Sequence, residues 1–72
     1  MAQALIYIAH FVSKLTDADA ENAETQHWLH TASSCGYISQ ETSEELLESS
    51  LQIGRMLGKM INAPKVFCKV SE

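Results

Sequence analysis

Three side chains that can bind metal ions follow one another at intervals of three residues: Glu24, His27 and His30. On a helix, Glu-x-x-His is the unit that carboxylate-bridged di-metal bundles use, and a symmetric dimer would supply it twice. His27 and His30 could also hold zinc. No additional carboxylate falls on the apolar stripe of the second predicted helix, so solvated histidines at the core edge are the better interpretation. A metal-binding bundle is therefore the lesser alternative, and we expect no cofactor.

A possible nucleophile is the Cys35 thiol, which follows His30 by about one helical turn. Nothing in the sequence supplies a third group to orient that histidine, or an oxyanion hole. Glycine-rich phosphate loops are also missing from the sequence. Cys35 and Cys68 have neither C-x-x-C nor metal-ligand spacing, which is typical of a reduced chain. We therefore expect no enzymatic activity, no catalytic residue and a cytoplasmic location.

The most recognisable polar group is formed by Glu21, Glu24 and Thr25. One interpretation is a contact with a partner or a nucleic acid. The other is a buried or half-buried set of hydrogen bonds that fixes the register of two helices, as a polar core position can. The structural interpretation is favoured.

The element that carries these residues is a predicted helix over residues 3–34, a stretch without Pro or Gly. Its apolar residues recur every three or four positions, which is typical of an amphipathic helix. Gly36 suits the left-handed residue after a helix end, and Ser39 suits the N-cap of the next helix. Thr42, with Glu45 three residues on, is the alternative cap.

The second predicted helix covers residues 40–62 and ends before Pro64. Its apolar stripe is predicted at Leu46, Ser50, Ile53, Leu57 and Met60. The tail, residues 63–72, could be a short strand, a docked arm or disordered. The fold class is therefore all-α: a single domain, residues 1–72, in which an antiparallel helical hairpin with a turn over 35–39 completes a four-helix-type bundle by self-association.

Self-association follows from the unequal helix lengths, because the second helix cannot cover all of the first. The uncovered residues 3–11 are strongly apolar and need a cover. Two helices alone also bury only one side of each stripe. The predicted oligomer interface and core comprise Leu5, Ile8, Phe11, Leu15, Thr25, Trp28, Leu29, Leu46, Ile53, Leu57 and Ile61.

The net charge of −4 is unevenly spread along the chain. Residues 1–48 hold eight acids against one lysine, whereas residues 49–72 hold four bases against one acid. Matching of the helix dipoles explains this pattern simply. The other interpretation is contact with RNA phosphates through the basic C-terminal end, formed by Arg55, Lys59, Lys65 and Lys69. No apolar run approaches the length of a membrane span, so we expect no membrane partner.

A longer pattern runs through about 50 residues of the chain. It consists of Phe11-Val12-Ser13-Lys14-Leu15, Glu21, Glu24-Thr25, Trp28-Leu29, Gly36-Tyr37-Ile38-Ser39, Leu46, Ile53, Leu57, Met60 and Ile61. This pattern resembles the C-terminal half of the bacterial four-helix-bundle proteins encoded in intervening sequences of 23S ribosomal RNA genes. That family is similar to the accessory variability proteins of diversity-generating retroelements.

The resemblance implies an all-α bundle that forms ring-like homo-oligomers, typically pentamers, with no known enzymatic activity. The retroelement relatives are strongly basic, and they bind nucleic acid and a reverse transcriptase. The chain corresponds to the third and fourth family helices, as a truncated copy or a compact variant that dimerises. We therefore expect a non-enzymatic accessory or assembly protein whose partner is itself, as a dimer or pentamer. The alternative is a module that binds RNA or a ribonucleoprotein.

Overall fold

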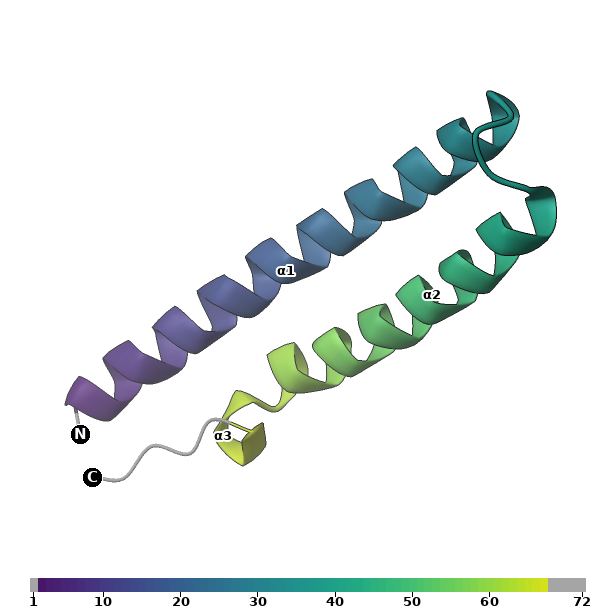
Figure 1. Cartoon of the computed structure of the whole chain (residues 1–72). Helices are drawn as coiled ribbons and strands as arrows, with labels where there is room; N and C mark the ends of the chain where they lie inside the picture. The colour runs from purple at the N-terminus through teal and green to yellow at the C-terminus, as the bar shows by residue number, and fades with distance from the viewer. Residues whose placement is uncertain (1, 68–72) are drawn as a thin grey trace.

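The computed structural model describes residues 2–67, and these residues form three helices and no strand (Figure 1). Helix α1 spans Ala2–Ser34, α2 spans Gln40–Asn62 and the short α3 spans Pro64–Phe67. Helices α1 and α2 run antiparallel as a hairpin, and α3 lies just past the end of α2, towards the open end, and contacts α1. The predicted all-α hairpin is confirmed.

The hairpin turn is set by local backbone chemistry at both of its ends. Gly36 has a φ of 78°, in the left-handed region that glycine enters without a Cβ penalty. The Tyr37 N–H donates to the Ala32 carbonyl at 2.9 Å and the Gly36 N–H donates to the Ser33 carbonyl at 3.1 Å. These two bonds form a Schellman motif, which satisfies carbonyls that the end of α1 would otherwise leave unpaired.

Helix α2 begins at the predicted N-cap, Ser39. The Ser39 hydroxyl accepts a hydrogen bond from the Thr42 N–H at 3.0 Å, and the backbone of Ser39 is extended, as an N-cap requires. The alternative cap, Thr42, lies inside the helix, so that alternative was wrong. Glu41 in the first turn and Lys59 in the last turn complement the helix dipole.

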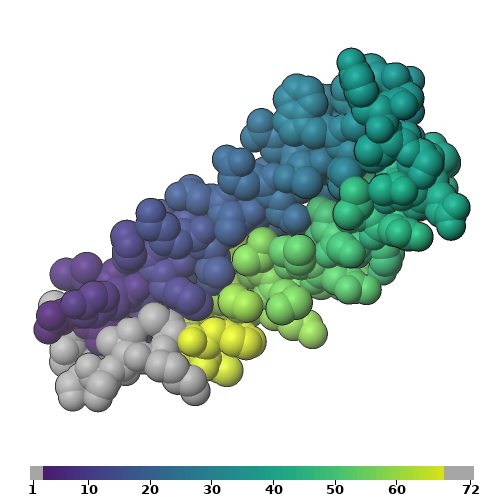
Figure 2. All heavy atoms as spheres, in the orientation of Figure 1, coloured from purple at the N-terminus to yellow at the C-terminus, as the bar shows by residue number. Residues whose placement is uncertain are grey.

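The molecule is a thin rod rather than a compact domain. It measures 52 × 15 × 14 Å, and α1 and α2 lie side by side along it (Figure 2). Its radius of gyration is 16.1 Å, whereas a compact chain of this length would have about 11 Å. Among the described residues, the buried ones are Ala4, Ser43 and Ser50. Because Ala4 is the one apolar residue among these three, the single hairpin has almost no hydrophobic core.

The face that α2 turns towards α1 agrees with the predicted stripe at Ser50, Leu57 and Met60 and differs from it at Leu46 and Ile53. Ser43 and Ser50 are buried, and Leu47 and Gly54 are half-buried, whereas the predicted Leu46 and Ile53 are 45% and 48% exposed. The spacing 43, 47, 50, 54 alternates four and three residues, as a helix seam does. Three of these four seam residues are small, and the large side chains of Leu46 and Ile53 lie on the flank of the seam.

The tail begins as a helix and not as a strand. Helix α3 contacts both α1 and α2, so it covers part of the end of α1 that α2 cannot reach. This cover is incomplete, because Leu5, Ile6 and Tyr7 are still 53–67% exposed. Residues 68–72 lie outside the described part of the chain.

Candidate functional site

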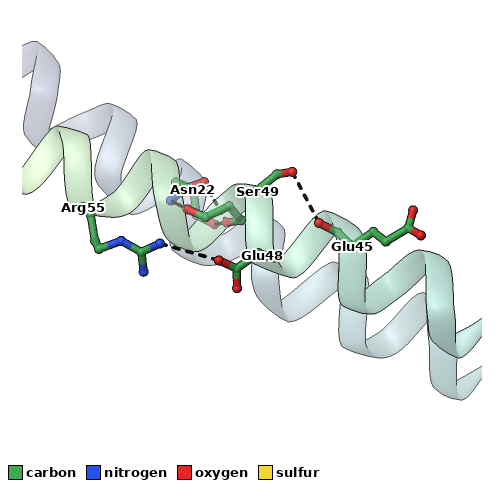
Figure 3. Close-up of polar contacts among 6 residues, drawn as sticks. Asn22, Glu45, Glu48, Ser49 and Arg55 are labelled. Carbon is green, nitrogen blue, oxygen red and sulfur yellow. Dashed lines mark hydrogen bonds and ion pairs between the residues drawn. The ribbon is translucent and has the colours of Figure 1, made fainter.

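A small polar network joins the two long helices near the middle of the rod (Figure 3). The Ser50 hydroxyl donates to Asn22 Oδ1 at 2.8 Å, and Asn22 Nδ2 donates to the Ser50 carbonyl at 2.9 Å. Gln26 Nε2 donates to the Ser50 hydroxyl at 3.1 Å. We call Asn22, Gln26 and Ser50 the polar lock. Reciprocal bonds of this kind satisfy each partner at one register of the two helices, so the lock fixes their alignment.

Small residues on α2 make the close approach of the helices possible. Ser43 is 2% exposed, and its hydroxyl donates to the Leu29 carbonyl at 3.4 Å. A Cβ atom added at Gly54 would lie 3.4 Å from Asn22 Nδ2. A side chain larger than serine at position 43, or larger than alanine at position 54, would push α2 away from α1 and stretch the polar lock.

An open cleft of about 340 Å³ lies beside the polar lock. It is lined by Asp19, Asn22, Ala23, Gln26, Leu51, Gly54 and Arg55. This lining offers a carboxylate and a guanidinium but no thiol, hydroxyl or imidazole. The Arg55 guanidinium lies 3.6 Å from a Glu48 carboxylate oxygen, with both side chains more than 60% exposed (Figure 3). Such an exposed pair contributes little to stability, about 0–1 kcal/mol.

The predicted interface and core residues fall into two groups. Half-buried in the single hairpin are Ile8, Phe11, Leu15, Leu29, Leu57 and Ile61. Exposed in it are Leu5, Thr25, Trp28, Leu46 and Ile53. Trp28, the largest side chain of the predicted interface and core, is 57% exposed in the single hairpin.

The predicted hydrogen-bond set at Glu21, Glu24 and Thr25 does not join the helices. All three residues are exposed, and the Thr25 hydroxyl donates to the Glu21 carbonyl of its own helix at 3.0 Å. The interpretation as a buried register-fixing set was therefore wrong for the single hairpin. The neighbouring Asn22 and Gln26 have that role. The signal that points to them is the polar residue at position 22 in the seven-residue series Leu15, Asn22, Leu29.

The metal candidates Glu24, His27 and His30 are exposed on α1. Within residues 2–67, no group of three or more His, Cys, Asp or Glu side chains is placed to hold an ion. The His27 ring meets the Trp28 ring edge-on, with centroids 5.2 Å apart. Cys35 is an exposed free thiol at the turn.

Two of the predicted nucleic-acid contacts, Lys59 and Lys65, are exposed towards the open end of the hairpin. Arg55 is exposed nearer the middle, beside the cleft that Asp19 also lines, and Lys69 lies beyond the described residues. Among the residues that the structure describes, no helix is both long enough and apolar enough to cross a membrane.

The comparisons with known proteins show which family the chain belongs to. The sequence profile of the 23S rRNA-intervening sequence protein family matches residues 2–59. The match includes α1, the turn and most of α2, so the chain belongs to this family. Neither a curated protein nor a solved structure matches the chain.

Proposed function

We propose that this member of the 23S rRNA-intervening sequence protein family is a non-enzymatic, self-associating helical hairpin with an accessory or assembly role in the cytoplasm. One observation carries the proposal. Among the described residues Ala4 is the one buried apolar side chain, while eleven large apolar or aromatic side chains are exposed. A good single core gives a chain of this length a net stability of only about 3–5 kcal/mol. This hairpin buries less apolar surface than such a core, so its own stability should be lower. A second copy is the simplest cover, because two hairpins make a four-helix bundle.

The exposed surface area supports the same proposal. The chain exposes 5453 Å². A compact monomer of 8.0 kDa would expose about 4,450 Å², so the excess is about 1,000 Å². A standard specific interface buries about 800 Å² on each partner. The excess is therefore as large as the area that one partner would cover.

The test is the absolute mass in solution, measured by light scattering after size exclusion, with circular dichroism of the same sample. We expect high helix content and a mass of at least twice 8.0 kDa. A helical chain that stays at 8.0 kDa over the micromolar range would refute self-association. A pentamer or another closed oligomer would support it as well as a dimer.

A second candidate is binding of RNA or a ribonucleoprotein through the basic C-terminal end. The observation that favours it is the exposure of Arg55, Lys59 and Lys65 in a stretch, residues 49–67, that contains no acid. Binding to structured RNA should fall steeply with salt, because it releases counterions from phosphates.

The variant that tests RNA binding neutralises Lys59, Lys65 and Lys69 by substitution with glutamine. The matched control neutralises Glu44 and Glu45 near the turn. We expect the lysine variant to lose binding and the glutamate variant to keep it. If the unmodified chain binds no structured RNA at low salt, this candidate fails.

A further inference from the structure

Charge is divided completely between two parts of the described chain. Residues 17–48 contain eight Asp or Glu and no Lys or Arg. Residues 2–16 and 49–67 contain Lys14, Arg55, Lys59 and Lys65 and no acid. All twelve charged side chains are exposed. We call residues 17–48 the acidic part and the two flanking stretches the basic part.

The hairpin converts this division along the chain into a division in space. The acidic part contains the turn and the adjoining halves of both helices, and the basic part forms the open end (Figure 1). The two parts overlap only at the centre, where Asn22 bonds to Ser50 and where Asp19 and Arg55 line one cleft. The 52 Å rod therefore has an acidic end and a basic end.

An apolar stripe on α2 connects the two ends. Leu46, Ile53 and Met60 are seven residues apart, so they share one side of the helix, beside the small-residue seam. Leu46 and Ile53 are exposed and Met60 is half-buried. Ile53 lies near the middle of the rod, because its neighbour Gly54 lines the same cleft as Asp19, close to the midpoint of α1. Leu46 lies towards the acidic end and Met60 towards the basic end.

We propose that two copies of this chain pack antiparallel along the stripe of Leu46, Ile53 and Met60, with the acidic end of each copy against the basic end of the other. This inference rests on the self-association proposed above and adds its surface and its direction. Packing with both turns at the same end would set eight acids beside eight acids, whereas the antiparallel arrangement pairs opposite charges. A two-fold axis through Ile53 would also place Leu46 of one copy opposite Met60 of the other, since both lie seven residues from it.

Disulfide cross-linking of the full chain tests the direction. In a background with Cys35→Ser and Cys68→Ser, the single variants Leu46→Cys and Met60→Cys are oxidised alone and as a mixture. The antiparallel arrangement predicts a cross-linked pair only in the mixture, with Cys at 46 joined to Cys at 60, identified by mass spectrometry. The control is Ile53→Cys, which should cross-link to itself in either direction if the α2 stripe is the interface.

The molar mass of the chain with Cys35→Ser and Cys68→Ser is measured first by light scattering. This measurement distinguishes a chain that does not associate from one that associates in another direction. An oligomer in which Leu46→Cys and Met60→Cys each cross-link alone would overturn the antiparallel direction and leave self-association standing. An oligomer in which none of the three variants cross-links would overturn the α2 stripe as the interface. An 8.0 kDa chain, with or without bound RNA, would overturn both proposals.

Salt provides a second readout of the direction. Exposed ion pairs are individually weak, so several together should make the dissociation constant rise by about tenfold between 0.05 and 1 M sodium chloride. Association that becomes tighter over this range would contradict the pairing of opposite ends.

Discussion

The polar lock can be tested by removing a single oxygen atom. Ser50 is 5% exposed, and its hydroxyl donates to Asn22 and accepts from Gln26. The substitution Ser50→Ala removes both of these side-chain bonds and leaves the backbone bond from Asn22 to the Ser50 carbonyl available. The released groups on Asn22 and Gln26 must then find water at a half-buried position.

The expected loss follows from the two bonds and one opposing effect. A hydrogen bond contributes about 0.5–1.5 kcal/mol net, so two bonds give about 1–3 kcal/mol. Alanine is a better helix former than serine by about 0.5 kcal/mol, and water partly replaces the lost partners. We therefore expect Ser50→Ala to lower the free energy of unfolding by about 1–2 kcal/mol. For a domain of this size, that corresponds to a fall in melting temperature of about 5–15 °C.

The assay is thermal and urea unfolding followed by circular dichroism, at one protein concentration, because association would add to the apparent stability. The matched control is Ser49→Ala. Ser49 is the adjacent residue, exposed, and its hydroxyl bonds only to the Glu45 carbonyl of its own helix (Figure 3). We expect the control to change stability by less than about 0.5 kcal/mol. A double-mutant cycle with Asn22→Ala isolates the coupling. If Ser50→Ala matches the control, or its effect adds to that of Asn22→Ala without coupling, the polar lock does not hold the helices in register.

Four further substitutions test the turn, the cap and the helix glycines by the same unfolding assay. Gly58→Ala should stabilise the chain by about 1 kcal/mol, because its site is open and alanine favours the helix. Gly54→Ala should gain no more than this, because its Cβ would lie 3.4 Å from Asn22 Nδ2, at the short limit of ordinary van der Waals contact. A larger gain at Gly54 would contradict the close approach there. Gly36→Ala should destabilise by about 1–2 kcal/mol, since φ is 78°, and an unchanged melting temperature would contradict this. Ser39→Ala should cost about 0.5–2 kcal/mol of capping, and no loss would mean that the Thr42 N–H finds another acceptor.

The turn was predictable because its chemistry is local. Gly36 ends α1 through its own backbone conformation, and Ser39 starts α2 by accepting from a residue three positions later. Neither choice depends on distant parts of the chain. Residues that end one helix and start the next therefore predict the hairpin even when its two helices pack weakly.

Apolar spacing predicted the seam only in part, at Ser50, because that signal assumes that the largest side chains face the partner helix. In α2 the stripe of large residues and the seam of small ones are neighbours, so either could face α1. What decides between them is Asn22 on the other helix, 28 residues away, which pairs with Ser50. The local pattern marks Asn22 as a polar residue within the series Leu15, Asn22, Leu29, but it does not identify Ser50 as its partner.

This arrangement divides two tasks between adjacent positions of α2. The seam residues Ser43, Ser50 and Gly54 bring the helices close and fix their register, but they remove little apolar surface from water. Since burial of apolar surface supplies most of the favourable free energy of folding, a hairpin built this way has specificity without much stability. Leu46 and Ile53, next to the seam, keep their apolar surface exposed and available to another molecule. In the self-association that we propose, the free energy missing from the single hairpin would be recovered, so folding and assembly of this chain should be coupled and depend on its concentration.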